Sequence, residues 1–172
     1  TDNYKTVVKK FAGGIWTELG NVGYYGNGPT RLAVSNTGVP YIAYYDEAAG
    51  KVQIKKFRTG NWMNVGEPDF LPLGSGWICL AINSNGIPFL TYQDKYIKKY
   101  TGGNWVDVGL QGEAGAIIGF DNQDIPYVFS GTVRKLTNGQ WKDLGTRYGF
   151  SAGSAAYVAA ATDGNGIPYV AY

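Results

Sequence analysis

The hydrophobic and polar positions of the chain alternate in short runs, and the same runs return about every 43 residues. One recurring block joins an apolar stretch, a turn rich in Asn, Asp and Gly, and an alternating stretch that opens with proline. It reads "LAVSNTGVPYIAYYD" from Leu32, "LAINSNGIPFLTYQD" from Leu80, "IGFDNQDIPYVFS" from Ile118 and "AATDGNGIPYVAY" from Ala160. Period-two alternation around a turn that accepts positive φ predicts a β-hairpin, and proline at the first residue of a strand costs no ladder hydrogen bond.

A second block is interleaved with the first. It reads "VKKFAGGIW" at 8–16, "IKKFRTGNW" at 54–62, "IKKYTGGNW" at 97–105 and "VRKLTNGQW" at 133–141, and each Trp opens the pattern Trp, two residues, Leu or Val, Gly. This block predicts another hairpin with a glycine-containing turn. The two hairpins together predict a four-stranded antiparallel meander in each unit.

The combination of "NGIPYVAY" with "KKFxGGxWxxLG" resembles the blade repeats of bacterial extracellular β-propeller proteins, and it covers nearly the whole chain. It is more distantly similar to kelch and Asp-box repeats, and to lectin-like propellers. The Asp-box order Ser-x-Asp-x-Gly-x-x-Trp is missing, so sialidase chemistry is not carried over. The resemblance implies an all-β propeller fold, a tendency to bind, and an extracellular or cell-surface location.

The order of the blocks predicts about four blades in a single domain, 1–172. Three complete blades are expected at 30–66, 77–109 and 115–145. Residues 6–20 would supply the third and fourth strands of a terminal blade, and residues 156–172 its first and second strands. Pairing these halves would close a monomeric ring, because closure removes unpaired edges. The alternative is a larger composite ring, completed by a second copy or by further sequence.

The connections between strands fall into two groups. Turns within each hairpin are short and uniform, whereas the loops from a fourth strand to the next first strand vary: "NVGYYGNGPT", "EPDFLPLGSGW", "LQGEAG" and "TRYGFSAGS". Function tends to sit on variable loops held by a rigid frame. The binding site is therefore expected on the face that carries these loops.

The variable loops contain aromatic and polar side chains that suit a sugar ring or a protein partner. Trp77 lies outside the repeat pattern and is the best single candidate for a ligand contact. The same aromatic residues could instead fill gaps between blades. The other candidate ligand-binding residues are Tyr24, Tyr25, Asn27, Asp69, Phe70, Arg147 and Tyr148, with Asp46 and Asp94 at the ends of two second strands.

Catalysis is not expected. Asp46 and Asp94 could form a glycosidase pair if their separation suited it, but a solvated or hydrogen-bonded carboxylate is the simpler interpretation. The chain has no His, which excludes His-based triads and the usual zinc sites. Asp121 and Asp163 lack the ligand spacing of a calcium loop and are assigned to turns. We expect no catalytic residue, metal or cofactor.

The charge and hydrophobicity of the chain argue against nucleic acid and the membrane interior as binding partners. A net charge of +2 does not favour nucleic acid, and no apolar run approaches the roughly 18 residues of a membrane span.

Cys79 lies in an apolar strand pattern and is expected to be a buried thiol. The repeated residues Trp16, Trp62, Trp105 and Trp141 are expected to pack between blades. The second block also carries a pair of basic residues in each unit, namely Lys9 and Lys10, Lys55 and Lys56, Lys98 and Lys99, and Arg134 and Lys135. One residue of each pair could form an ion pair across the hairpin with Glu18, Asp107 or Asp143.

The sequence thus predicts a non-enzymatic, lectin-like binding propeller whose partner is a carbohydrate or protein ligand. The alternative is a protein-interaction or structural propeller, either by itself or as part of a larger surface protein or composite ring.

Overall fold

The computed structural model describes residues 5–24, 30–46, 49–67, 77–93, 95–109, 115–129, 131–145 and 159–171. In these ranges every regular element is a β-strand, and all paired strands are antiparallel. The prediction of an all-β chain is confirmed.

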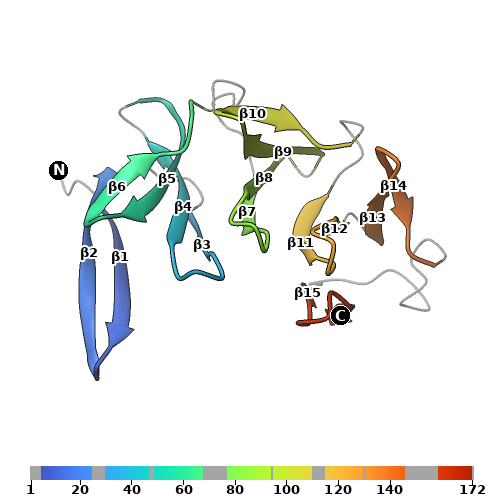
Figure 1. Cartoon of the computed structure of the whole chain (residues 1–172). Helices are drawn as coiled ribbons and strands as arrows, with labels where there is room; N and C mark the ends of the chain where they lie inside the picture. Colours follow the sequence, from blue (N-terminus) through green and yellow to red (C-terminus); the bar gives the residue numbers. More distant parts are fainter. Residues whose placement is uncertain are drawn as a thin grey trace.

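Three sheets have four strands in meander order, and we call them the complete sheets. They correspond to the three complete units predicted from the repeats (Figure 1). Their strands are β3 (Thr30–Val34), β4 (Pro40–Asp46), β5 (Lys51–Arg58) and β6 (Asn61–Asn64); β7 (Ile78–Ile82), β8 (Pro88–Tyr92), β9 (Tyr96–Thr101) and β10 (Asn104–Asp107); and β11 (Ala116–Phe120), β12 (Pro126–Phe129), β13 (Val133–Thr137) and β14 (Gln140–Asp143).

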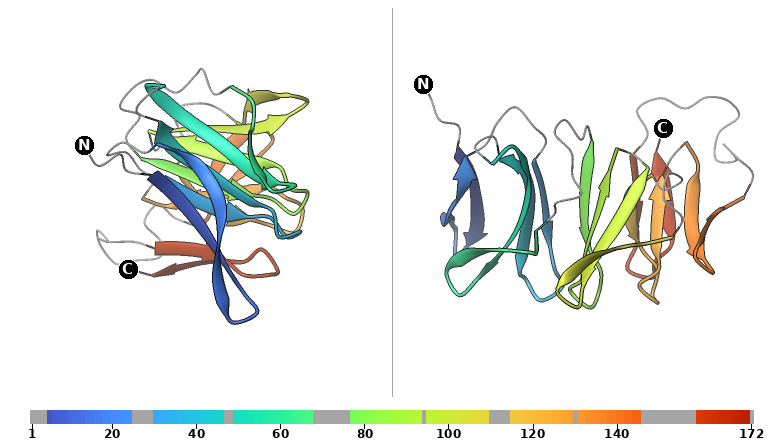
Figure 2. Two further views of the ribbon diagram at one scale, coloured as in Figure 1. Left: turned by 90° about the vertical axis from the view of Figure 1, so that its left-hand side faces the viewer. Right: turned by 90° about the horizontal axis from the view of Figure 1, so that it is seen from above.

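Two further sheets have two strands each, and we call them the terminal hairpins. They consist of β1 (Lys5–Ala12) with β2 (Ile15–Tyr24), and of β15 (Ala159–Thr162) with β16 (Pro168–Ala171). The sequence predicts that both belong to one terminal sheet, but they are separate sheets in the described part of the chain. They lie at opposite ends of a curved row, with the complete sheets between them (Figures 1 and 2).

The turns of the first-block hairpins share one side-chain hydrogen bond. A side-chain oxygen accepts from the backbone N–H four residues later, which closes the turn and sets the entry into the proline-led strand. The bonds run from Val39 to Ser35, from Ile87 to Asn83, from Ile125 to Asp121 and from Ile167 to Asp163, at 2.8–3.1 Å. The assignment of Asp121 and Asp163 to turn chemistry is confirmed.

The hydrophobic core lies between neighbouring sheets. Ile54 and Leu90 are fully buried in the cluster between the first two complete sheets, and Val128 is fully buried in the cluster between the second and third. A third cluster joins Val8 and Val22 of the N-terminal hairpin to Ile42 and Tyr44 of the first complete sheet. Each sheet therefore depends on its neighbours for burial, as in repeat proteins.

The repeated tryptophans also bridge the sheets, as predicted, with one exception. The indole N–H of Trp62 donates to the Leu19 carbonyl at 2.8 Å, and that of Trp105 donates to the Val65 carbonyl at 2.9 Å. Trp141 is buried in the cluster between the second and third complete sheets. Trp16, in the N-terminal hairpin, is 66% exposed.

The predicted cross-strand ion pairs form in two of the complete sheets. Lys98 Nζ lies 2.5 Å from Asp107 Oδ1, and Arg134 Nε lies 2.7 Å from Asp143 Oδ1. Lys9 stands opposite Glu18 in the ladder of the N-terminal hairpin. Such exposed pairs stabilise a sheet modestly.

Candidate functional site

Most residues predicted to bind a ligand lie outside the described residues. Trp77 and Asp46 are described, and Tyr24 is described only as the last residue of β2. The predicted residues outside the described ranges are Tyr25, Asn27, Asp69, Phe70, Asp94, Arg147 and Tyr148.

Trp77 is an exposed side chain on a fixed backbone. Its carbonyl accepts a hydrogen bond from the Gln93 N–H at 3.1 Å, while its side chain is 70% exposed. The Arg31 guanidinium carbon lies 5.9 Å from the centre of the Trp77 ring, within range of a cation–π contact. Trp77 therefore combines an open aromatic surface with a neighbouring positive charge.

Asp46 has a structural role at the end of β4. Its Oδ1 accepts a hydrogen bond from the Ala49 N–H, two residues before β5, at 3.0 Å. Burial, together with the negative charge of Asp46, raises the pKa of Tyr44 to about 12. These contacts support the interpretation of Asp46 as a hydrogen-bonded carboxylate.

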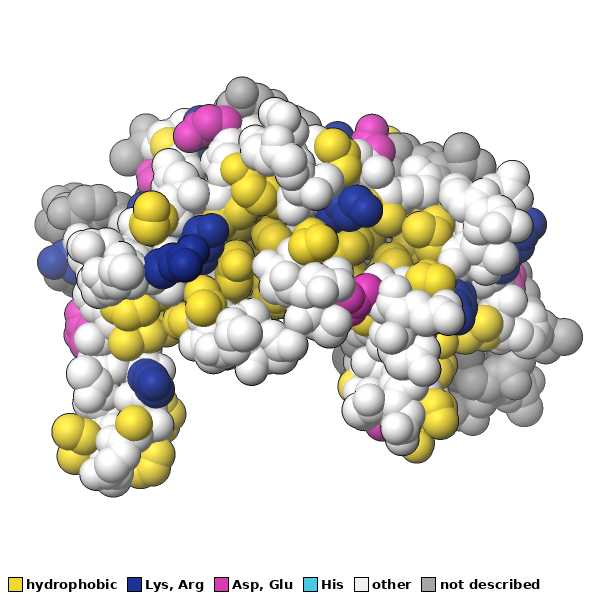
Figure 3. All heavy atoms as spheres, in the orientation of Figure 1, with side chains coloured by type: hydrophobic (Ala, Val, Ile, Leu, Met, Phe, Trp, Pro, Cys, Tyr) yellow, Lys and Arg dark blue, Asp and Glu magenta, His cyan; other side chains and the backbone are white. Residues whose placement is uncertain are grey.

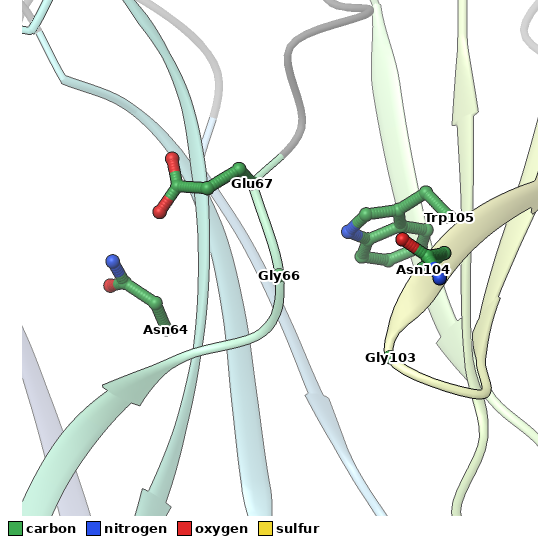
Figure 4. Close-up of a pocket in the computed structure, with 6 residues that line it drawn as sticks. All are labelled: Asn64, Gly66, Glu67, Gly103, Asn104 and Trp105. Carbon is green, nitrogen blue, oxygen red and sulfur yellow. The ribbon is translucent and has the colours of Figure 1, made fainter.

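A pocket of about 430 Å³ opens between the first and second complete sheets (Figure 4). One side is formed by Asn64, Gly66 and Glu67 at the end of β6. The other side is formed by Gly103, in the turn between β9 and β10, and by Asn104 and Trp105 at the start of β10. In Figure 4 the Glu67 and Asn64 side chains lie across the opening from the Trp105 ring and Asn104.

The aromatic wall of the pocket is held by packing. Besides its hydrogen bond to the Val65 carbonyl, Trp105 packs against Tyr100 with ring centres 5.4 Å apart. Gly66 has φ +67°, and a Cβ there would lie 2.5 Å from Tyr100 Cε2. Only glycine allows the second sheet to approach the first this closely in that conformation. The indole ring of Trp105 is therefore held in one position before any ligand binds.

The polar side of the pocket carries a negative charge. Glu67 Oε2 accepts a hydrogen bond from Lys51 Nζ at 3.0 Å, and this bond and the charge of Lys51 lower the pKa of Glu67. Glu67 is thus an ionised hydrogen-bond acceptor at neutral pH. Asn64 and Asn104 add amide groups that can both donate and accept.

An indole ring beside amides and a carboxylate can bind a molecule with an apolar face and several hydroxyl groups. Glu67 is the one ionisable group among the residues that line the pocket. A pair of carboxylates, as glycoside hydrolysis needs, is therefore not present in that lining.

Sequence reasoning missed this pocket because Trp105 was assigned to packing alone and the turn before it to the scaffold. A signal was present in the repeat itself. At the position of Asn64 the next two units have Asp107 and Asp143, and at the position of Glu67 they have Leu110 and Thr146. The combination of an amide and a carboxylate thus occurs once among these three junctions.

Comparison with models of known protein families finds no match, and comparison with curated proteins finds none either. Among the described residues, no group of three or more His, Cys, Asp or Glu side chains is placed to hold a metal ion. The described ranges contain no helix that is long and apolar enough to cross a membrane.

Proposed function

We propose that the chain is a non-enzymatic binding protein with a β-propeller architecture, and that its ligand is a carbohydrate. The fold part of the proposal is supported by three consecutive four-stranded meanders whose first strands follow one another along a curved row (Figure 1). It is also supported by the resemblance of the repeats to blades of secreted and surface propellers, which favours an extracellular location.

The observation that carries the binding proposal is the pocket between the first two complete sheets. Trp105 offers an aromatic surface to the apolar face of a sugar ring, while Asn64, Asn104 and Glu67 can bond to its hydroxyl groups. Ordered packing behind Trp105 and the ion pair from Lys51 to Glu67 hold these groups before a ligand arrives. These side chains would then lose little conformational entropy when a ligand binds.

Trp77 and Arg31 form a second contact surface in the proposal. The exposed indole suits stacking on a sugar, and the guanidinium beside it suits an acidic or hydroxyl-rich substituent. Two shallow sites on one molecule would raise the avidity for a branched or repeating glycan without any new contact.

A glycan array probed with the labelled chain tests the proposal. We expect the parent to bind a related set of sugars, and Asn104→Ala to weaken that binding about tenfold, because a buried ligand hydroxyl would lose its partner. Asn61→Ala is the matched control, since Asn61 occupies the same turn position in the first complete sheet and does not line the pocket.

Trp77→Ala separates the two surfaces. It should reduce binding to multivalent glycans and leave the melting curve close to that of the parent, because the side chain is exposed. An array on which the folded parent binds nothing would contradict carbohydrate binding. The alternative of a protein-interaction propeller, with the same aromatic residues as anchors, would then take its place.

A further inference from the structure

The terminal hairpins expose a residue that every complete sheet buries. The aromatic residue after the proline of the second strand is buried in all three complete sheets, as Tyr41, Phe89 and Tyr127. The same position in β16 is Tyr169, which is 60% exposed. Tyr169 thus has the chemistry of a core residue, and in the part of the chain that the structure describes no third or fourth strand joins its sheet.

The N-terminal hairpin exposes the complementary surface. Phe11, Ile15 and Trp16 are all more than half exposed. Figure 3 shows hydrophobic side chains gathered at the tip of this projecting hairpin, at the lower left. The corresponding residues of the first complete sheet, Phe57 and Trp62, are partly buried.

A matching place for Trp16 lies at the far end of the row. Trp62 and Trp105 each dock on the preceding unit, at the Leu or Val that comes before its closing glycine. Leu144 has that place in the third complete sheet and is 40% exposed, whereas Val65 is buried. The row therefore ends in a partly exposed docking position and begins with an exposed tryptophan.

The ladder register of the complete sheets defines how the two hairpins would pair. The buried aromatic residue of the second strand always stands opposite the second basic residue of the third strand. The pairs are Tyr41 with Lys56, Phe89 with Lys99, and Tyr127 with Lys135. In the first-block and second-block repeats, the corresponding residues of the terminal hairpins are Tyr169 and Lys10.

A lysine and a tyrosine already contact each other at the same two positions of the third complete sheet. Lys135 Nζ lies 5.7 Å from the centre of the Tyr127 ring, a cation–π contact between the two register partners. The same contact is available to Lys10 and Tyr169. One step further along, Val170 and Lys9 would stand as Val128 and Arg134 do.

We propose that β15–β16 of one copy and β1–β2 of a second copy join into one four-stranded antiparallel sheet. The partner is a second copy because the two hairpins of one chain lie at opposite ends of the row, as two views agree (Figures 1 and 2). The new sheet buries Tyr169, docks Trp16 near Leu144 and pairs two open strand edges. The inference does not depend on the carbohydrate binding proposed above.

Two copies joined at both junctions form a closed ring. Each copy brings three complete sheets and two half sheets, so the pair holds eight four-stranded sheets. Propellers have about four to eight blades, and this number lies within that range. Closure by two identical head-to-tail junctions leaves no two-stranded sheet at either end of a row.

Disulfide trapping between different copies tests the register. Cys79 is first replaced by Ala, and then Lys10→Cys and Tyr169→Cys are introduced in separate chains. When the two variants are mixed and oxidised, we expect a cross-linked species of two chains, with the bond mapped to these two positions by mass spectrometry. Mixing is essential, because only contact between copies can link chains that carry one cysteine each.

Ala161→Cys is the matched control for Tyr169→Cys. Ala161 stands opposite Tyr169 in the β15–β16 ladder and is one strand farther from the predicted partner. Its mixture with the Lys10→Cys variant should give little cross-linking. Equal cross-linking of both mixtures would overturn the proposed register.

The mass of the unmodified chain in solution is the second measurement. A native mass of two copies, each 18.6 kDa, is expected, and Tyr169→Ala with Trp16→Ala should weaken association at least about tenfold with an unchanged β-sheet circular dichroism spectrum. A single-chain mass at all concentrations would overturn the proposal. So would a chain carrying both cysteines that cross-links only within itself.

Discussion

The complete sheets and the terminal hairpins are built from the same repeated sequence blocks, yet the same residue types differ in burial between them. Phe89 is 3% exposed inside the second complete sheet, and Tyr169 at the same repeat position is 60% exposed in β16. Trp105 docks on the neighbouring sheet, whereas Trp16 is exposed. What differs is the presence of two further strands and of a neighbour on each side.

This difference shows that the repeated residues serve two purposes: they form the strands of one sheet, and they pack that sheet against its neighbour. The four strands of one meander pair with one another, but they bury their hydrophobic faces only against the next unit. The following experiments compare the two regions at matched positions. Each is performed with dilute protein, so that the properties of a single chain are measured.

The largest effect is expected from Phe89→Ala. Phe89 is buried between the second and third complete sheets, with its ring 5.0 Å from that of Phe120. Its removal leaves a cavity and should lower the free energy of unfolding by about 3–5 kcal/mol. Tyr169→Ala should change it by less than about 0.5 kcal/mol, as is usual for an exposed position. Urea denaturation of both variants measures the contrast, and equal losses would contradict it.

The next effect concerns the attachment of the N-terminal hairpin at high pH. Tyr44 is fully buried, and its hydroxyl donates to the Val22 carbonyl of β2 at 3.2 Å. Burial and the charge of Asp46 raise the pKa of Tyr44 to about 12, above the value of 10.0 for an unperturbed tyrosine. The folded state therefore holds the phenol proton of Tyr44 more tightly than the unfolded state does. The resulting contribution to the free energy of unfolding is complete below pH 10 and is lost as the pH rises towards 12.

Tyr44→Phe isolates that contribution. Between pH 10 and 12 the parent should lose up to about 1.4 kcal/mol of unfolding free energy per pH unit more than the variant loses. Phenylalanine keeps the ring near Lys55 Nζ, which lies 5.5 Å from the ring centre in the parent. Thermal melts of both proteins across this range measure the slope, and identical slopes would show that Tyr44 ionises as freely in the folded chain as in the unfolded chain.

A smaller effect is expected from replacing glycine where two sheets meet. Gly66 and Gly145 have similar positive φ values, +67° and +78°, so alanine strains the backbone at both positions. A Cβ at Gly66 would also meet Tyr100, whereas one at Gly145 has nothing within 4 Å. Gly66→Ala should therefore cost about 1–3 kcal/mol more than Gly145→Ala. Equal costs in a denaturation experiment would mean that the sheets can separate without loss.

The smallest effect is expected from the indole hydrogen bonds. Trp105→Phe removes the donor to the Val65 carbonyl and should cost about 0.5–1.5 kcal/mol, apart from the loss of ring area. Trp16→Phe is the control, because that ring is exposed in the single chain. A larger loss for Trp16→Phe than for Trp105→Phe would contradict the contrast between the two regions.

Much of the local structure could be predicted from the sequence. Proline-led alternation placed the second strands, and the turn residues Ser35, Asn83, Asp121 and Asp163 make the hydrogen bonds that their type and position imply. The register next to each short hairpin turn also follows from the sequence, because a short turn leaves little freedom in how two neighbouring strands pair. These features depend on residues close together in the chain.

The candidate contact surfaces follow from the sequence only in part. Trp77 is a candidate because it departs from the repeat, and the structure places Arg31 beside its ring. The pocket with Asn64, Glu67 and Trp105 was missed, because its two walls come from different sheets. Their distance depends on how closely Gly66 lets those sheets approach, and that is a property of packing.

The sequence by itself determined the strands, their turns and their antiparallel order within each unit, because hydrophobic alternation and turn chemistry act over a few residues. Only the tertiary structure decided how far each sheet turns from the next, where the pocket opens, and that the terminal hairpins stand apart. These outcomes depend on side-chain contacts between units about 40 residues apart, and a small change in packing at each junction adds up along the row.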